Sequence, residues 1–137
     1  MIQPSELRIG NLIISDLDEF VYISSITINS VEGKRPSDIF TTNWQTVFSP
    51  KPIPLTEEWL LKAGFEIRES LSYKEYFIGT NEVTHDWLFS LTWINDPERI
   101  NAINAPFFNN GRHTIQYVHQ LQNLYFALTG KELEFKL

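Results

Sequence analysis

Three histidines are the side chains of this sequence best suited to chemistry, because an imidazole can act as an acid, a base or a metal ligand near neutral pH. His85 is followed directly by Asp86, but neighbours on an extended strand face opposite sides, so the two side chains cannot pair there. His113 and His119 are six positions apart, whereas two metal ligands on one helix face need a separation of three or four. The spacing of His113 and His119 therefore predicts no metal site. His85 shares a predicted strand face with Trp87, which favours a structural role for His85 at the edge of a core.

Two acidic clusters could supply paired carboxylates of the kind that glycosidases use. Glu57 and Glu58 lie at the predicted start of a helix, where acidic side chains suit the positive end of the helix dipole. Asp16, Asp18 and Glu19 fall in a predicted turn, where acidic residues are common and exposed to water. Both clusters thus have a structural explanation, and we favour it over catalysis.

Standard catalytic and cofactor motifs are absent from the sequence, which has no glycine-rich phosphate loop, no nucleophile elbow and no His-Glu-x-x-His run. It also has no cysteine, which excludes disulfides, thiolate zinc sites, iron–sulfur clusters and a cysteine nucleophile. We therefore predict no catalytic residue, no cofactor and no metal, and a protein that is not an enzyme. For an enzyme of another type, His85, Asp86 and His113 would be the residues to test.

Composition indicates a folded protein, with 42% hydrophobic and 20% charged residues. The net charge of −6 disfavours nucleic acid, and only Lys34 and Arg35 are adjacent basic residues, so no basic stripe is visible. No apolar run reaches the roughly 20 residues that span a bilayer. The N-terminal residues show no basic and apolar signal segment. We expect a soluble, cytoplasmic protein that does not bind membranes.

The elements that must position these side chains begin with short strands. Residues rich in Val, Ile, Tyr and Thr predict strands over 12–14 and 20–28 and a short strand or hairpin over 39–48, with a loop over 30–38. Three alternating prolines in residues 50–54 predict a stiff extended connector. We expect a single domain over residues 1–137, with a possible subdomain boundary near 50–55.

The second half of the chain predicts a meander and a long helix. A short helix begins at Thr56 and ends at Gly64, and strands follow over 65–69, 73–78 and 83–94. The C-terminal helix covers about residues 115–128, capped by Thr114 and ended by Gly130, and residues 133–137 could add an edge strand. The fold class is therefore α+β, a mostly antiparallel sheet packed against the long helix and the short middle helix. The N-terminal strands could curl into a small barrel-like unit.

The C-terminal helix is unusual because residues 114–130 contain no charged side chain, whereas a surface helix normally carries charges opposite its apolar stripe. Its polar side carries Gln116, His119, Gln120 and Asn123, which are the candidate partner-binding residues. Three explanations stay open. The helix could be buried within its own domain, it could form a homo-oligomer interface, or it could receive another partner, including nucleic acid read by amide side chains.

Three segments resemble signatures of a family of uncharacterised proteins found in Bacteroides-type bacteria and in their phages and mobile elements. The most specific is Tyr117–Gly130, which reads YVHQLQNLYFALTG and is followed by Glu132 and Leu133. The other two are LRIGN at residues 7–11 and PIPLTEEWL at residues 52–60, so the resemblance spans the chain. It implies a bacterial or phage cytoplasmic setting and supplies no catalytic residues.

The function predicted from the sequence is therefore a non-enzymatic interaction or accessory protein of a phage or mobile element. A nucleic-acid-associated accessory factor is the alternative, favoured by the abundant aromatic residues and the amide-rich helix. Absence of a gel shift with DNA at low salt would dispose of that alternative. The sequence specifies neither the partner nor the process.

Overall fold

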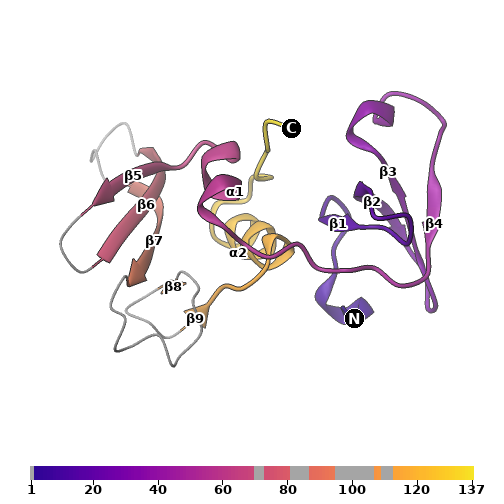
Figure 1. Ribbon diagram of the computed structural model, residues 1–137, viewed down its shortest axis with the longest axis horizontal. Coiled ribbons are helices and arrows are strands. Elements are labelled where there is room, and N and C mark those ends of the chain that lie inside the picture. The colour runs from indigo at the N-terminus through magenta and orange to yellow at the C-terminus, as the bar shows by residue number, and fades with distance from the viewer. Residues whose placement is uncertain (1, 70–72, 81–86, 95–106, 109–112) are drawn as a thin grey trace. The chain divides into compact units, whose positions relative to one another are not determined.

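The computed structural model of the protein describes residues 2–69, 73–80, 87–94, 107–108 and 113–137 (Figure 1). The chain divides into two compact units. Unit 1 comprises residues 1–54 and 117–132, and unit 2 comprises residues 55–116 and 133–137. The first crossing from unit 1 to unit 2 lies between Pro54 and Leu55.

Unit 1 is built on a four-stranded antiparallel sheet in the order β1-β2-β3-β4 (Figure 1). Its elements are the 3-10 turns η1 (Pro4–Glu6) and η2 (Pro36–Asp38), the strands β1 (Leu12–Ile14), β2 (Phe20–Ile26), β3 (Val31–Lys34) and β4 (Gln45–Val47), and the helix α2 (Val118–Thr129). One face of the sheet forms an apolar core. Its members are Ile2, Leu7, Ile13, Val21, Ile23, Val31 and Val47.

The sheet bends at a bulge in β2, where the register against β3 shifts between Ile23 and Ser25. After β4 the chain returns to the first strand, because Lys51 and Ile14 exchange backbone hydrogen bonds of 2.9 and 3.0 Å. This isolated bridge brings the two edges of the sheet towards each other. It does not close a barrel among the residues that the structure describes.

Helix α2 packs against β1 within unit 1. Its buried side chains are Val118, His119, Leu121, Gln122 and Tyr125, so the buried face combines apolar residues with an imidazole and an amide. Gly130 ends the helix in the left-handed conformation at φ 70°, which its missing Cβ permits without strain. The sequence prediction for this end of the helix is confirmed.

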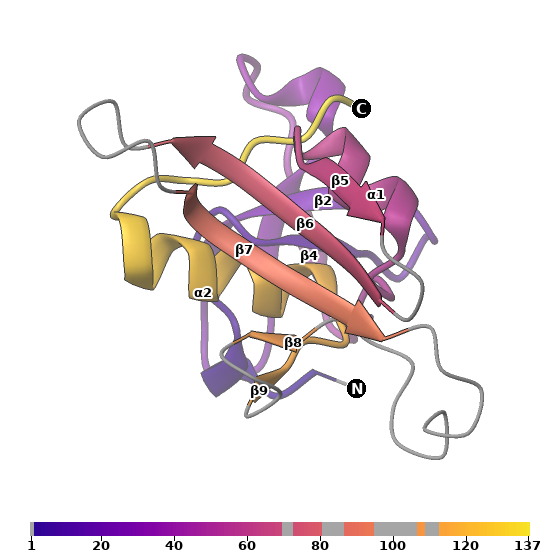
Figure 2. The same ribbon diagram turned by 90° about the vertical axis from the view of Figure 1, so that its left-hand side faces the viewer.

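Unit 2 contains a five-stranded antiparallel sheet in the order β5-β6-β7-β8-β9, and Figure 2 shows β6 and β7 as long neighbouring strands. Its elements are α1 (Glu57–Lys62), β5 (Glu66–Glu69), β6 (Tyr73–Thr80), β7 (Trp87–Ile94), β8 (Phe107–Phe108) and β9 (His113–Thr114). Trp59 of α1 is buried and meets Phe135 of the C-terminal tail edge to face, with ring centroids 5.6 Å apart. These contacts hold the short helix, which would not be stable alone.

The predicted α+β class, with antiparallel sheets and a long C-terminal helix, is confirmed. No helix in the described ranges is both long enough and apolar enough to cross a bilayer.

The predicted start of the C-terminal helix is wrong. α2 begins at Val118 rather than near Ile115, because the preceding residues pair as extended chain. In unit 2 the Leu55 amide donates to the Gln116 carbonyl oxygen at 2.9 Å, and in unit 1 the Val118 amide donates to the Ile53 carbonyl oxygen at 2.9 Å. Backbone pairing with a distant segment thus overrides the local helical signal.

Two further local predictions are wrong, those for residues 30–38 and 133–137, whereas the predicted start of the short helix at Thr56 is confirmed. The predicted loop over 30–38 contains β3 and η2, because Gly33 pairs with both β2 and β4 and Pro36 begins the 3-10 turn. Thr56 is the N-cap of α1 but makes no side-chain capping hydrogen bond. Residues 133–137 form no strand, and instead the Lys136 amide donates to the Lys62 carbonyl oxygen at 2.8 Å.

Candidate functional site

The four side chains that the sequence proposes for partner binding do not form one exposed surface. Gln116 is exposed and precedes the helix, whereas His119 is 1% exposed. The Gln120 side-chain oxygen accepts a hydrogen bond of 3.2 Å from the Tyr117 amide at the helix start. Asn123 is partly buried and bound to the N-terminal segment of the chain. The amide side of α2 therefore faces its own unit.

Gln122 and Asn123 bind the polypeptide just before and within β1. The Gln122 side chain accepts a hydrogen bond from the Leu12 amide at 2.8 Å and donates one to the Gly10 carbonyl oxygen at 3.1 Å. The Asn123 side chain accepts from the Asn11 side chain at 2.8 Å and donates to the Glu6 carbonyl oxygen at 2.9 Å. Amides can be buried at low cost when both their donor and acceptor sides are satisfied in this way.

Two of the segments on which the family resemblance depends therefore contact each other. Arg8 adds three contacts: it lies over the Phe126 ring at 4.3 Å, donates to Asn123 at 3.3 Å and forms a salt bridge with Glu132. Folding of unit 1 accounts for the missing charges on the buried side of α2, and no partner is needed to explain them.

His119 fits a structural role within this packing. Its ring stacks on Tyr117 with centroids 5.8 Å apart and planes 11° apart. Neither ring nitrogen has a hydrogen-bond partner among the residues that the structure describes. Burial lowers the pKa of His119 below its ordinary value, and the nearby Glu6 carboxylate opposes that shift. The imidazole is thus held neutral in the folded protein.

The other sequence candidates for chemistry are two further histidines, one aspartate and two acidic clusters. His85 and Asp86 lie outside the described residues, and His113 lies in β9. In the described ranges no cluster of three His, Asp or Glu residues could hold a metal ion. Of the two acidic clusters, Glu57 accepts hydrogen bonds from Lys74 at 3.3 Å and from Tyr76 at 3.2 Å.

The acids of the β1–β2 turn are each engaged separately. Both oxygens of Asp16 accept backbone hydrogen bonds from residues 48 and 49, at 2.9 and 3.0 Å. Asp18 pairs with Lys51 at 2.6 Å and adopts a left-handed backbone, which Asp tolerates. Glu19 lines a pocket of unit 1.

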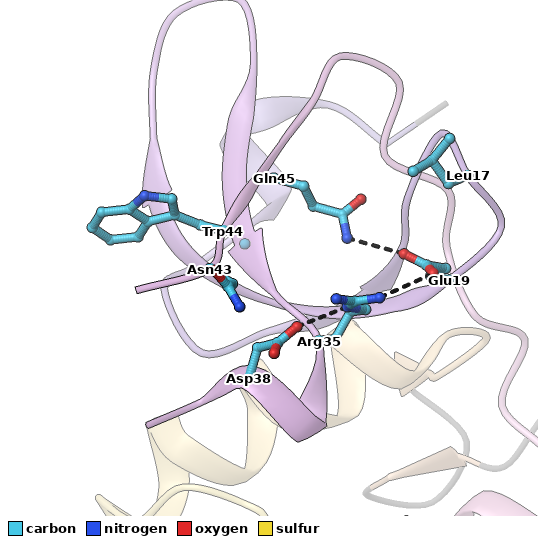
Figure 3. Close-up of a pocket in the computed structure, with 8 residues that line it drawn as sticks. Leu17, Glu19, Arg35, Asp38, Asn43, Trp44 and Gln45 are labelled. Carbon is cyan, nitrogen blue, oxygen red and sulfur yellow. Dashed lines mark hydrogen bonds and ion pairs between the residues drawn. The ribbon is translucent and has the colours of Figure 1, made fainter. Parts of the chain in front are cut away.

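That pocket, a cavity of about 240 Å³ in unit 1, gathers polar side chains (Figure 3). The β1–β2 turn, β3, η2 and its flanks, and β4 supply its walls. The lining residues are Leu17, Glu19, Gly33, Arg35, Asp38, Asn43, Trp44 and Gln45. Gly33 is required here, because a Cβ at this position would lie 2.8 Å from the Tyr22 carbonyl oxygen of β2.

Arg35 links the two acids of the pocket, as Figure 3 shows. Its Nε donates to Asp38 at 2.8 Å, and its terminal nitrogen lies 3.6 Å from Glu19. The other Glu19 oxygen accepts from the Gln45 side chain at 3.2 Å. The hydrogen bond to Asp38, with the charges of both acids, raises the pKa of the Arg35 guanidinium. The pocket is therefore a preassembled polar network with one more negative than positive charge.

Exposed aromatic side chains extend from the pocket along residues 39–48, which we call the aromatic segment. Phe40 is fully exposed, Trp44 is 62% exposed and Phe48 is 67% exposed. The Lys34 ammonium lies 5.1 Å from the Trp44 ring and also donates to the Thr41 carbonyl oxygen. Sequence reasoning assigned this segment to a strand or hairpin and missed its exposure. The available signal is three aromatic residues four positions apart among mostly polar neighbours, a spacing that would place all three on one face of a strand.

Comparison of the chain with known protein families, curated proteins and solved structures finds no match. The geometry of the site is therefore the basis for its function.

Proposed function

We propose that the protein is a non-enzymatic interaction protein that binds a macromolecular partner through the aromatic segment and the adjoining pocket. The observation that carries this proposal is the exposure of Phe40, Trp44 and Phe48 along ten residues of unit 1. Aromatic residues are enriched in protein interfaces and supply most of their hot spots.

Energetics support a contact role for these side chains. Burying one large apolar side chain contributes about 1.5–3 kcal/mol, so covering these three would contribute several kcal/mol to association. No comparable gain comes from folding, because they remain in water in the isolated chain. An exposed aromatic group of this kind typically marks an interaction site.

The setting that we propose is the cytoplasm of a bacterium that carries a phage or mobile element, where the protein acts as an accessory factor. This part of the proposal rests on the three segments that resemble the family described above. The described residues include no cluster that could hold a metal, which is compatible with a role in binding.

Photo-crosslinking from the full-length protein tests the proposal. A benzoylphenylalanine at position 40 should give a discrete adduct in cells that carry the gene, and Trp44→Ala should reduce its yield. The same group at position 28 is the matched control, since Ile28 is 89% exposed in the same unit but lies outside the aromatic segment. Equal adducts from positions 40 and 28, or turnover of a hydrolase panel by the purified protein, would contradict the proposal.

A single-stranded nucleic acid is the second candidate partner, favoured by the Lys34 ammonium over the exposed Trp44 ring. Bases could stack on Trp44, but the net charge of −6 opposes phosphate binding. A gel shift with single-stranded DNA at low salt that is lost in Trp44→Ala would favour this candidate. No shift at low salt removes it.

A further inference from the structure

The pocket beside the aromatic segment has a size that limits what it can hold. Its volume is about 240 Å³. Pockets that enclose a free ligand of drug or cofactor size usually measure about 300–1,000 Å³. A space below that range suits a single side chain presented by a larger partner, and the exposed Trp44 at its wall lets such a partner continue onto the aromatic segment.

The charges of the pocket select the kind of side chain. Its lining residues carry two carboxylates, on Glu19 and Asp38, and one guanidinium, on Arg35, which gives a net charge of −1. The guanidinium already contacts both acids. Lys34 is the neighbouring cation, and its ammonium is occupied by the Thr41 carbonyl oxygen and the Trp44 ring. The two carboxylates would repel an incoming anion, whereas an incoming cation can bind to the carboxylate oxygens of Glu19 and Asp38.

Neutral polar groups complete the site. Asn43 and Gln45 line the same space, and in the part of the chain that the structure describes the Asn43 side chain makes no hydrogen bond. Figure 3 shows Leu17 and Trp44 on opposite sides of the polar group, so apolar walls flank the acids. An amphipathic basic side chain, with an apolar stem and a charged head, matches these walls and this floor.

We propose, on the basis of the proposed function, that this pocket binds an arginine or lysine side chain of a different protein chain, whose neighbouring apolar residues cover the aromatic segment. A second copy of this chain is a poor occupant, because its own net charge of −6 repels it at long range. The same charge speeds the encounter with a basic partner.

Peptide titration of the isotope-labelled full-length protein tests this proposal. The probe is a blocked peptide, acetyl-Pro-Leu-Arg-Leu-Pro-amide, compared with the same peptide carrying citrulline or glutamate in place of arginine. Citrulline keeps the shape of arginine and removes its charge. We expect saturable NMR shifts at the side-chain signals of Asn43, Trp44 and Gln45, with a dissociation constant on the order of 1 mM and about threefold weaker binding of the citrulline peptide.

Two variants provide matched controls. Glu19→Gln removes one charge from the pocket and should weaken the arginine peptide about threefold. Glu134→Gln removes one charge from an exposed position of unit 2 and should leave the affinity unchanged. The proposal is overturned if the arginine peptide gives no saturable shift, if citrulline binds equally well, or if the glutamate peptide binds more tightly. Any of these results together with a discrete adduct from position 40 would leave the interaction function standing without a basic partner.

Discussion

Replacing Gln122 by leucine tests whether the buried amide of α2 holds unit 1 together. The Gln122 side chain is 1% exposed and satisfies the Leu12 amide at 2.8 Å and the Gly10 carbonyl oxygen at 3.1 Å. Leucine has a similar size, so the substitution leaves two backbone groups without partners and creates little empty space. The substitution thus separates the contribution of these hydrogen bonds to stability from the contribution of packing.

The magnitude follows from the burial of the two backbone groups. Leu12 is fully buried, so its orphaned amide should cost about 1–3 kcal/mol. Gly10 is partly exposed, so its carbonyl oxygen can accept a hydrogen bond from water, and the loss of its Gln122 donor should cost about 1 kcal/mol. Together the two orphaned groups should lower the free energy of unfolding by about 2–4 kcal/mol, of which the added apolar surface offsets a part. Domains of this size have about 5–15 kcal/mol in total.

Urea unfolding followed through the NMR signals of unit 1 measures the loss, and the midpoint should fall by about 1–2 M. Amide hydrogen exchange at Leu12 gives a local readout, since its protection should drop in the variant. Leu128→Gln is the matched control, because this position of the same helix is 52% exposed and the change should stay within about 0.5 kcal/mol. A midpoint shift no larger than the control, with unchanged Leu12 protection, would refute the reasoning.

Three further predictions concern other contacts of unit 1. Because burial lowers the pKa of His119, the unfolded chain binds the proton before the folded chain does as the pH falls below about 6.5. The stability of the protein should therefore decrease from about pH 7.5 to about pH 5.5, and the urea midpoint of His119→Phe should depend less on pH. Parallel midpoint profiles of the two proteins would contradict this. Gly33→Ala should lower the free energy of unfolding, measured in urea, by about 1–3 kcal/mol because the added Cβ would lie 2.8 Å from a backbone oxygen. Gly130→Ala should lower it by about 1 kcal/mol, because a Cβ there meets nothing within 4 Å but the backbone φ is +70°. A larger loss for Gly130→Ala would refute the steric argument. Glu132→Gln should lower the free energy of unfolding by less than about 1 kcal/mol, and by less still at high salt. Arg8→Ala should lower it more, because this variant also loses the contacts with Phe126 and Asn123. Equal shifts of the melting temperature in the two variants would show that only the ion pair contributes.

Much of the fold follows from local sequence patterns. The run Leu12–Ile14 and the Val, Ile and Tyr residues after Phe20 predict β1 and β2, because branched and aromatic side chains fit a pleated sheet. Gly64 and Gly130 mark the ends of both α-helices, and both adopt positive φ in the structure. These features depend on neighbours in the sequence, so a single chain reveals them.

The errors arise where distant residues decide the local structure. β3 contains Gly33, which favours a loop in the sequence, but the close approach of β2 leaves no room for a side chain at this position. The late start of α2 reflects backbone pairing of Val118 with Ile53. The charge-free helix is visible in the sequence, but the partners of Gln122 lie more than a hundred residues away.

The pocket could not be predicted for the same reason. Its central ion pair joins Glu19 to Arg35, and no local pattern links a residue of one turn to the end of another strand. The exposure of Phe40, Trp44 and Phe48 depends on the path of the chain between η2 and β4. Sequence reasoning instead placed the candidate site on α2, where the absence of charge on the inner side of the helix reflects burial.

The interruption of unit 1 by residues 55–116 has a consequence for synthesis of the protein. The strands of unit 1 are made first, but the helix that packs on β1 is made only after the whole intervening segment. At translation rates of about 5–20 residues per second, β1 waits on the order of 5–20 s for α2. During that interval the Leu12 amide and the Gly10 carbonyl oxygen lack their Gln122 partner, so a nascent chain stalled before residue 117 carries an unfinished N-terminal unit.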